Sequence, residues 1–168
     1  MNRRKGLLYV CILLLALGVQ FVFSSQPYGQ QDMRGQLKKY IDLNGIQKKV
    51  GNISFQYVNK EISFENNGVE GVLEFLIRKA GHFFGFMFIG IMLFQAIRYL
   101  SSPAYSLPWS LFLSLFLGVF DEWHQSFTPD RSSLVTDVVL DFSGAFIGII
   151  FLFVYTIFRK KQKSLKML

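Results

Sequence analysis

Hydrophobic residues gather into four long runs, which polar segments separate. The runs cover residues 6–23, 80–97, 107–120 and 138–158. As helices, at about 1.5 Å per residue, they would span most or all of a hydrocarbon layer about 30 Å thick. Helices are expected because lipid offers no hydrogen-bond partners to backbone N–H and C=O groups. The pattern therefore predicts an all-α membrane protein, a bundle of four transmembrane helices.

The first run, Gly6 to Phe23, is apolar and follows the basic residues 3–5, as the apolar region of a signal peptide follows a basic start. At about 18 residues, however, it is longer than the apolar region of a signal peptide. Ser24-Ser25-Gln26 would permit cleavage, but it is not a clean small-x-small site. We therefore expect this run to be an uncleaved membrane anchor.

The segment between the first two runs, residues 24–79, carries structural signals of its own. Apolar and polar side chains alternate over residues 53–57, and a second alternating stretch, residues 62–64, follows Asn59-Lys60. This spacing predicts a small hairpin. Over residues 37–50 apolar side chains lie among lysines, which suits either an amphipathic helix at the lipid surface or a solvated loop.

The placement of basic residues orients the chain in the membrane. Basic clusters at residues 3–5 and 159–163, together with Lys166, flank the first and last runs. By the positive-inside rule we expect both termini in the cytoplasm. With four spans, residues 24–79 and 121–137 would then lie outside the cell.

Length, charge and cysteine content exclude several alternatives. The 168 residues carry a formal net charge of +7, but membrane topology explains that charge, so we expect no nucleic-acid partner. The length suits a single domain, residues 1–168. The one cysteine, Cys11, allows no disulfide within the chain and no cysteine-based metal site.

Ionisable residues interrupt three of the runs at the same end of the membrane. His82 opens the second run, Asp121 and Glu122 close the third, and Asp141 lies near the start of the fourth. The apolar helix beyond them measures about 23 Å from His82, about 21 Å from Asp121 and about 26 Å from Asp141. Each length is shorter than a core of about 30 Å, so we expect these residues at least one turn below the outer surface. Charge at that depth is costly and normally marks function.

Helical spacing adds further polar side chains at this depth. Asp121 and Gln125 are four residues apart, Asp137 and Asp141 likewise, and Arg131 lies between the two runs. We predict that these groups form one ligand-binding site. Its predicted members are Lys79, His82, Asp121, Glu122, Gln125, Arg131, Asp137 and Asp141. The alternative is that these groups only pair with one another and fix the register of the helices.

Glycines accompany the polar residues on two of the runs. Gly144 and Gly148 are four residues apart, and so are Gly81 and Gly85. A small residue at every fourth position lets two helices approach closely. We therefore expect both faces to pack against other helices and not against lipid.

At these residues the chain resembles the VanZ-like family of bacterial membrane proteins. The family pattern has a basic-x-x-His-Phe start to one span, matched by residues 79–83, and an Asp-Glu-x-x-Gln-x-Phe motif, matched by residues 121–127. It continues with Pro-Gly-Arg, an Asp and an Asn on the last helix, and a glycine pair. The corresponding residues here are Pro129, Asp130, Arg131, Asp137, Asp141, Gly144 and Gly148. Asp130 replaces the family's Gly, and Asp141 replaces its Asn.

The resemblance implies a protein of the bacterial plasma membrane, and the family's namesake is associated with resistance to teicoplanin, a lipid-tailed glycopeptide. One hypothesis is a non-enzymatic envelope protein that lowers susceptibility to such lipoglycopeptides. Its site would bind a lipid headgroup or a lipopeptide, with membrane lipids or a lipid-linked cell-wall intermediate as partners. Lys79, His82 and Arg131 would supply cations for phosphate.

A second hypothesis is a membrane enzyme that acts on a lipid-linked substrate. His82, Asp121 and Glu122 are then the candidate catalytic residues, because burial near carboxylates can tune a base toward neutrality. The carboxylates of Asp121, Glu122 and Asp141 could hold a divalent metal in such an enzyme, although we assign no metal and no cofactor to the site. A transporter is a third class, which four spans without a discontinuous helix disfavour.

Overall fold

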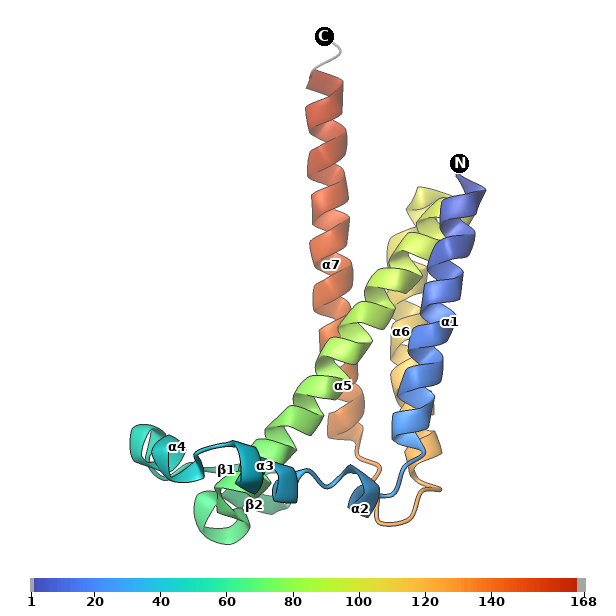
Figure 1. Ribbon diagram of the computed structural model, residues 1–168. Coiled ribbons are helices and arrows are strands. Elements are labelled where there is room, and N and C mark those ends of the chain that lie inside the picture. Colours follow the sequence, from blue (N-terminus) through green and yellow to red (C-terminus); the bar gives the residue numbers. More distant parts are fainter. Residues whose placement is uncertain (1, 166–168) are drawn as a thin grey trace. The chain divides into compact units, whose positions relative to one another are not determined.

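Four long helices dominate the computed structural model, which describes residues 2–165 and their side chains as far as Gln162. They are α1 (Arg3–Ser24), α5 (Phe64–Leu100), α6 (Pro103–Gln125) and α7 (Val135–Leu165), shown in Figure 1. All four are long and apolar enough to cross a membrane. The predicted all-α architecture is confirmed, and the chain is a multi-pass membrane protein. Lys166, one of the predicted basic residues, lies outside the described residues.

The chain forms two compact units. The bundle unit joins residues 1–25 to residues 82–168, and the hairpin unit comprises residues 26–81. Helix α5 belongs to both, since the boundary falls between Gly81 and His82. The prediction that residues 1–168 form a single domain stays a prediction.

Apolar side chains fill the centre of the bundle unit. One cluster joins Leu13 of α1 to Ile89 and Leu93 of α5, and another joins Phe94 of α5 to Ile149 of α7. Helix α6 packs against both α1 and α7. Many large apolar side chains of the four helices are exposed on the outside. A helix that is apolar on both its inner and outer faces suits a lipid surrounding.

The buried face of α6 is formed by small and polar residues, not by large apolar ones. Ser106, Ser110, Ser114 and Gly118 are buried at intervals of four residues. This spacing places them on one side of the helix. Two of the serines satisfy their hydroxyls locally, because Ser106 and Ser110 donate to backbone carbonyl oxygens three residues earlier. The face continues into Asp121 and so leads directly to the polar end of α6.

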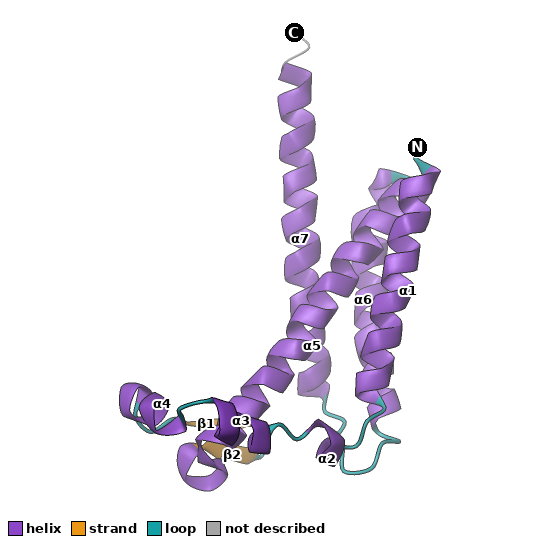
Figure 2. Cartoon of the chain, in the orientation of Figure 1, coloured by secondary structure: helices purple, strands orange, loops and turns teal. Residues whose placement is uncertain are grey.

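The hairpin unit contains a two-stranded antiparallel sheet and short helices. Strands β1 (Ser54–Tyr57) and β2 (Lys60–Ser63) pair in a register that sets Ser54 opposite Ser63 and Tyr57 opposite Lys60. Figure 2 shows the two strands among helices. The predicted hairpin between the first two spans is confirmed. Ile62 and Phe64 of this region are buried together with Val69 and Val72 at the start of α5.

Three short helices precede the hairpin. They are α2 (Tyr28–Gln31), α3 (Arg34–Tyr40) and α4 (Leu43–Val50). The lysine-rich stretch, for which a helix and a loop were both open, therefore contains two helical segments. Leu37 of α3 is buried, whereas Tyr40 and Val50 are exposed.

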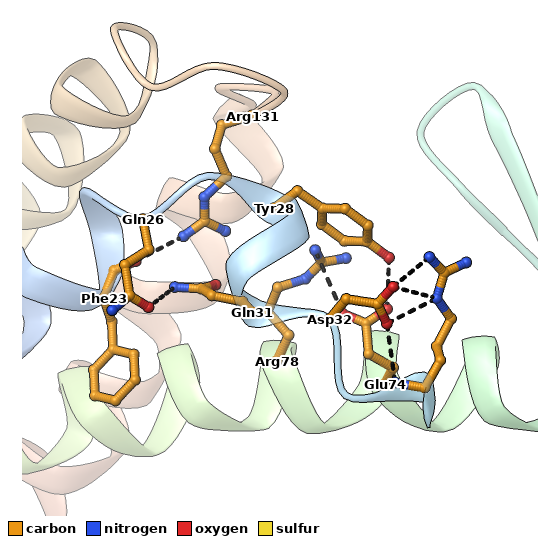
Figure 3. A network of polar contacts seen from close by, with 9 residues as sticks. Phe23, Gln26, Tyr28, Gln31, Asp32, Glu74, Arg78 and Arg131 are labelled. Atoms are coloured by element: carbon orange, nitrogen blue, oxygen red, sulfur yellow. Dashed lines mark hydrogen bonds and ion pairs between the residues drawn. The ribbon is translucent and has the colours of Figure 1, made fainter. Parts of the chain in front are cut away.

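A buried carboxylate joins α2 to α5 within the hairpin unit. Glu74 is only 2% exposed. The Tyr28 hydroxyl donates a hydrogen bond to Glu74 Oε2 at 2.7 Å, and Arg78 Nη1 lies 3.8 Å from Glu74 Oε1. The Arg78 guanidinium also stands over the Tyr28 ring, 4.8 Å from its centroid, so the three side chains form one network (Figure 3). The charge of Glu74 is thereby compensated, as a buried charge requires.

Candidate functional site

Three helices each contribute one ionisable side chain to a single cluster in the bundle unit. His82 comes from α5, Asp121 from the last turns of α6 and Asp141 from the second turn of α7. His82 Nδ1 lies 3.4 Å from Asp141 Oδ1 and 3.9 Å from Asp121 Oδ2. Asp141 is fully buried and Asp121 is 7% exposed. We call these three residues the His–Asp–Asp cluster.

The three side chains of the cluster offer more hydrogen-bond acceptors than donors. Neither carboxylate oxygen of Asp141 has a hydrogen-bond partner within residues 2–165. A neutral imidazole that accepts through Nδ1 adds a third acceptor to the two carboxylates. A proton or a cation between these atoms would balance them.

Gln20 of α1 is a fourth contributor that sequence reasoning missed. Its amide nitrogen lies 3.4 Å from His82 Nδ1 and donates to Asp121 Oδ2 at 3.4 Å. Gln20 is the one amide in the otherwise apolar run of residues 6–23. A single amide in a transmembrane run normally faces a polar partner, and that signal could have identified it.

Gln125 holds the Asp121 carboxylate from the same helix. Its amide nitrogen donates to Asp121 Oδ2 at 2.8 Å, which the spacing of four residues allows. Gln125 is 3% exposed. Two amides therefore hold Asp121 from two helices, and its orientation is fixed more firmly than that of Asp141.

Glu122 serves a different part of the molecule from its neighbour Asp121. Its Oε2 accepts a hydrogen bond from the backbone N–H of Leu134 at 2.9 Å. Leu134 immediately precedes α7, so this carboxylate satisfies a backbone donor where the helix begins. The contact fixes the segment between α6 and α7 against the last turn of α6.

That connecting segment is also attached to the end of α1. Arg131 donates from Nη2 to the carbonyl oxygen of Phe23 at 3.1 Å (Figure 3), and Thr128 donates to the carbonyl oxygen of Ser24 at 3.4 Å. Asp130 adopts the left-handed conformation, with φ of 59°. Glycine favours this conformation and Asp tolerates it, so Asp130 can occupy the position where the resemblance leads one to expect Gly.

The two remaining predicted site residues make contacts of other kinds. The Lys79 ammonium lies 4.7 Å from the Tyr57 ring centroid and 5.5 Å from that of Phe75, within the hairpin unit. Asp137 is buried in the first turn of α7, where the helix dipole favours a negative charge. The structure thus brings His82, Asp121 and Asp141 together, joins Gln125 to them through Asp121, and gives Lys79, Glu122 and Arg131 the separate contacts described above.

The cluster has the chemistry to hold a small cation or to move a proton. Each of its three side chains offers one ligand atom, and these atoms lie within 4.8 Å of one another. An imidazole next to a carboxylate is also the arrangement of a general base held in place by its partner. The burial of Asp141 strengthens the electrostatic interactions on which both uses depend.

Comparison with known proteins agrees with the motif pattern. The model of the VanZ/LLP1 family matches residues 8–159, which include every member of the His–Asp–Asp cluster. Comparisons with curated proteins and with solved structures yield no significant match. The matched range covers most of the chain and contains the motifs at residues 79–83 and 121–127. The chain therefore belongs to the VanZ/LLP1 family.

Proposed function

We propose that this protein binds the polar headgroup of a lipid or lipid-tailed molecule in the bacterial cell membrane. Through this binding it lowers susceptibility to lipid-tailed glycopeptides such as teicoplanin. The observation that carries the proposal is the convergence of His82, Asp121 and Asp141 from three helices at one end of the bundle unit. Membership of the VanZ/LLP1 family supports the link to this class of antibiotic.

The end of α6 that carries Asp121 also presents groups that suit a ligand with a polar head and an apolar tail. Trp123 and Phe127 stack edge to face, and both are more than half exposed, at the end of α6 that carries Asp121. Exposed aromatic rings of this kind favour the interface between lipid and water. Arg131 lies in the connecting segment after the same end of α6, and its planar guanidinium suits a phosphate or carboxylate. A lipid-like ligand would meet both kinds of surface.

The orientation of the chain follows from its basic clusters. Arg3, Arg4 and Lys5 begin α1, and Arg159–Lys161 lie near the end of α7. Under the positive-inside rule both ends face the cytoplasm. The end of α6 that carries Asp121 then faces the outer leaflet, where lipid-linked cell-wall precursors and glycopeptides meet.

The proposal predicts a selective gain in drug tolerance. Cells that overproduce the protein should tolerate teicoplanin better than control cells, while their tolerance of vancomycin, which has no lipid tail, should change less. Minimal inhibitory concentrations of the two drugs measure this difference. Equal gains for both drugs, or no gain for either, would contradict a site that recognises a lipid-tailed molecule.

One conservative variant tests the part that Arg131, in the segment after α6, takes in ligand binding. Arg131→Lys keeps the charge but loses the guanidinium fork. Loss of a charge-assisted hydrogen bond, about 1.5–3 kcal/mol, should weaken ligand binding by roughly tenfold or more. Teicoplanin tolerance should therefore fall. The matched control is Arg34→Lys, at an arginine that pairs with Asp32 in the hairpin unit, and it should leave tolerance unchanged.

A further inference from the structure

We propose that the His–Asp–Asp cluster binds one divalent transition-metal ion, with His82 Nδ1 and one carboxylate oxygen each of Asp121 and Asp141 as ligands. No metal was expected at this site from the sequence. For its role in the cell the inference rests on the proposed function, because the metal would then contact the ligand's headgroup. Metal binding itself is tested without reference to any drug.

The spacing of the three side chains is the first argument. Bonds from zinc to imidazole nitrogen and carboxylate oxygen measure about 2.0–2.2 Å, so two ligands on a tetrahedron lie about 3.4 Å apart. His82 Nδ1 lies 3.4 Å from Asp141 Oδ1 and 3.9 Å from Asp121 Oδ2. These two pairs therefore already have nearly the separations that one shared ion requires, and all three ligand atoms lie within 4.8 Å of one another. Side-chain rotations that draw the three atoms together would complete the geometry.

The environment of Asp141 is the second, independent argument. The residue has an exposed fraction of 0%, and neither of its oxygens has a hydrogen-bond partner in the described part of the chain. An ionised carboxylate in that position requires a positive partner. With a neutral imidazole, two carboxylates and one divalent cation, the net charge of the cluster becomes zero. A monovalent proton on His82 would leave one negative charge in excess.

The residues around the cluster resemble the outer shell of a metal site. Gln125 and Gln20 both donate amide hydrogens to Asp121 Oδ2. Ligating carboxylates in proteins are commonly fixed in this way, and the outer partners raise metal affinity. The cluster is thus supported by side chains that already hold one of its ligands in place.

The ligand set indicates the class of metal and leaves a position for a further ligand. One imidazole and two carboxylates suit Zn²⁺ or Mn²⁺ better than copper(I), which prefers sulfur. Three protein ligands leave a fourth position to a water molecule or to an anionic headgroup. Asp141 is central, because it is the fully buried ligand and neither of its oxygens has a hydrogen-bond partner among the described residues.

Metal titration of the full-length protein in detergent tests the inference. After treatment with a chelator, the protein should bind one equivalent of Zn²⁺ by calorimetry and one of Mn²⁺ by electron paramagnetic resonance. Asp141→Asn and His82→Gln should weaken binding by more than about 100-fold, since the loss of an outer-shell partner alone costs about 10–100-fold. Asp130→Asn is the matched control. It removes an exposed carboxylate at a left-handed position that Asn tolerates, and it should bind like the wild type.

The outcomes separate the metal from its alternatives. Absence of stoichiometric binding to the wild type, or equal binding by wild type and Asp141→Asn, would overturn the inference and leave a proton between His82 and Asp141. Should a variant fail to accumulate, X-ray absorption at the zinc edge of the wild type decides, because one imidazole per zinc is expected and none or two would contradict it. If the protein binds the metal but its overproduction does not raise drug tolerance, the proposed function is overturned and the metal inference stands.

Discussion

Asp141 is the residue whose position is hardest to explain by packing. It is fully buried in the second turn of α7, where an apolar side chain would be less costly. Its equal depth with His82 and Asp121 could be predicted from the lengths of the apolar runs. The part played by Gln20 could be predicted only from its being the one amide of an apolar run, because run lengths give no information about it. The contact of Glu122 with the backbone of Leu134 depends on the path of the connecting segment, which spacing does not specify.

Tyr28 offers a test at the scale of a single hydroxyl. Burial, followed by the hydrogen bond to Glu74, raises the pKa of Tyr28 above its ordinary value of 10.0. The Tyr28→Phe substitution removes that hydrogen bond from the buried Glu74. The hairpin unit should lose about 1.5–3 kcal/mol of stability, because hydrogen bonds to charged groups contribute about that much. Thermal unfolding in detergent, monitored by circular dichroism, measures the loss.

The same substitution changes the dependence on pH. The pKa of Tyr28 is higher in the folded than in the unfolded protein, so folding favours the neutral phenol. This preference stabilises the folded protein fully at pH values below the pKa of the unfolded state. This contribution is lost as the pH rises through the folded pKa. The wild type should therefore lose stability above about pH 10 more steeply than Tyr28→Phe. Tyr40→Phe, at a tyrosine that is 76% exposed, is the control and should behave like the wild type.

At the scale of elements, glycines set how closely α5 and α7 approach. A Cβ atom on Gly144 would overlap the backbone carbonyl of Phe83, and one on Gly148 would come within 2.8 Å of the carbonyl oxygen of Met87. Gly144 and Gly148 thus behave as their spacing predicts. Of the other predicted pair, Gly85 lies near Gln20, whereas a Cβ on Gly81 would meet no described atom within 4 Å.

Gly144→Ala should therefore push two helices apart. The neighbouring atoms are backbone and cannot move independently, so we expect a loss of about 1–3 kcal/mol, the usual cost of overpacking. Gly18→Ala on α1 is the matched control, because a Cβ there meets no described atom within 4 Å. Melting temperatures of the two variants in detergent provide the comparison. Equal melting temperatures would show that α5 and α7 are not in close contact at Gly144.

The start of α5 is a helix boundary that hydropathy alone does not predict. The sequence predicted the second span from residue 80, but α5 begins at Phe64. The additional residues are amphipathic, with Val69 and Val72 buried in the hairpin unit and Glu74 paired inside it. Hydropathy alone does not detect such a segment, since its apolar face is compensated by charged residues. The hairpin itself was predictable because alternation is a local signal.

For the whole molecule, topology is the property that the sequence predicts and that labelling can test. In a Cys11→Ser background, Asn59→Cys and Ser102→Cys each introduce one exposed thiol. With both termini in the cytoplasm, an impermeant maleimide should label Asn59→Cys on intact cells and Ser102→Cys only after permeabilisation. The opposite result would invert the orientation and place the His–Asp–Asp cluster in the inner leaflet.

We propose that the His–Asp–Asp cluster acts on a ligand and does not merely hold helices together. Asp121→Asn removes one charge at nearly constant shape, so it tests this claim most directly. Teicoplanin tolerance and the amount of folded protein in the membrane should be measured on the same cells. We expect tolerance to be lost while the protein level stays near that of the wild type. A purely structural cluster, in which breaking a buried pair costs about 3–5 kcal/mol, predicts that tolerance and protein level fall together. That result, or unchanged tolerance at a normal protein level, would contradict the claim.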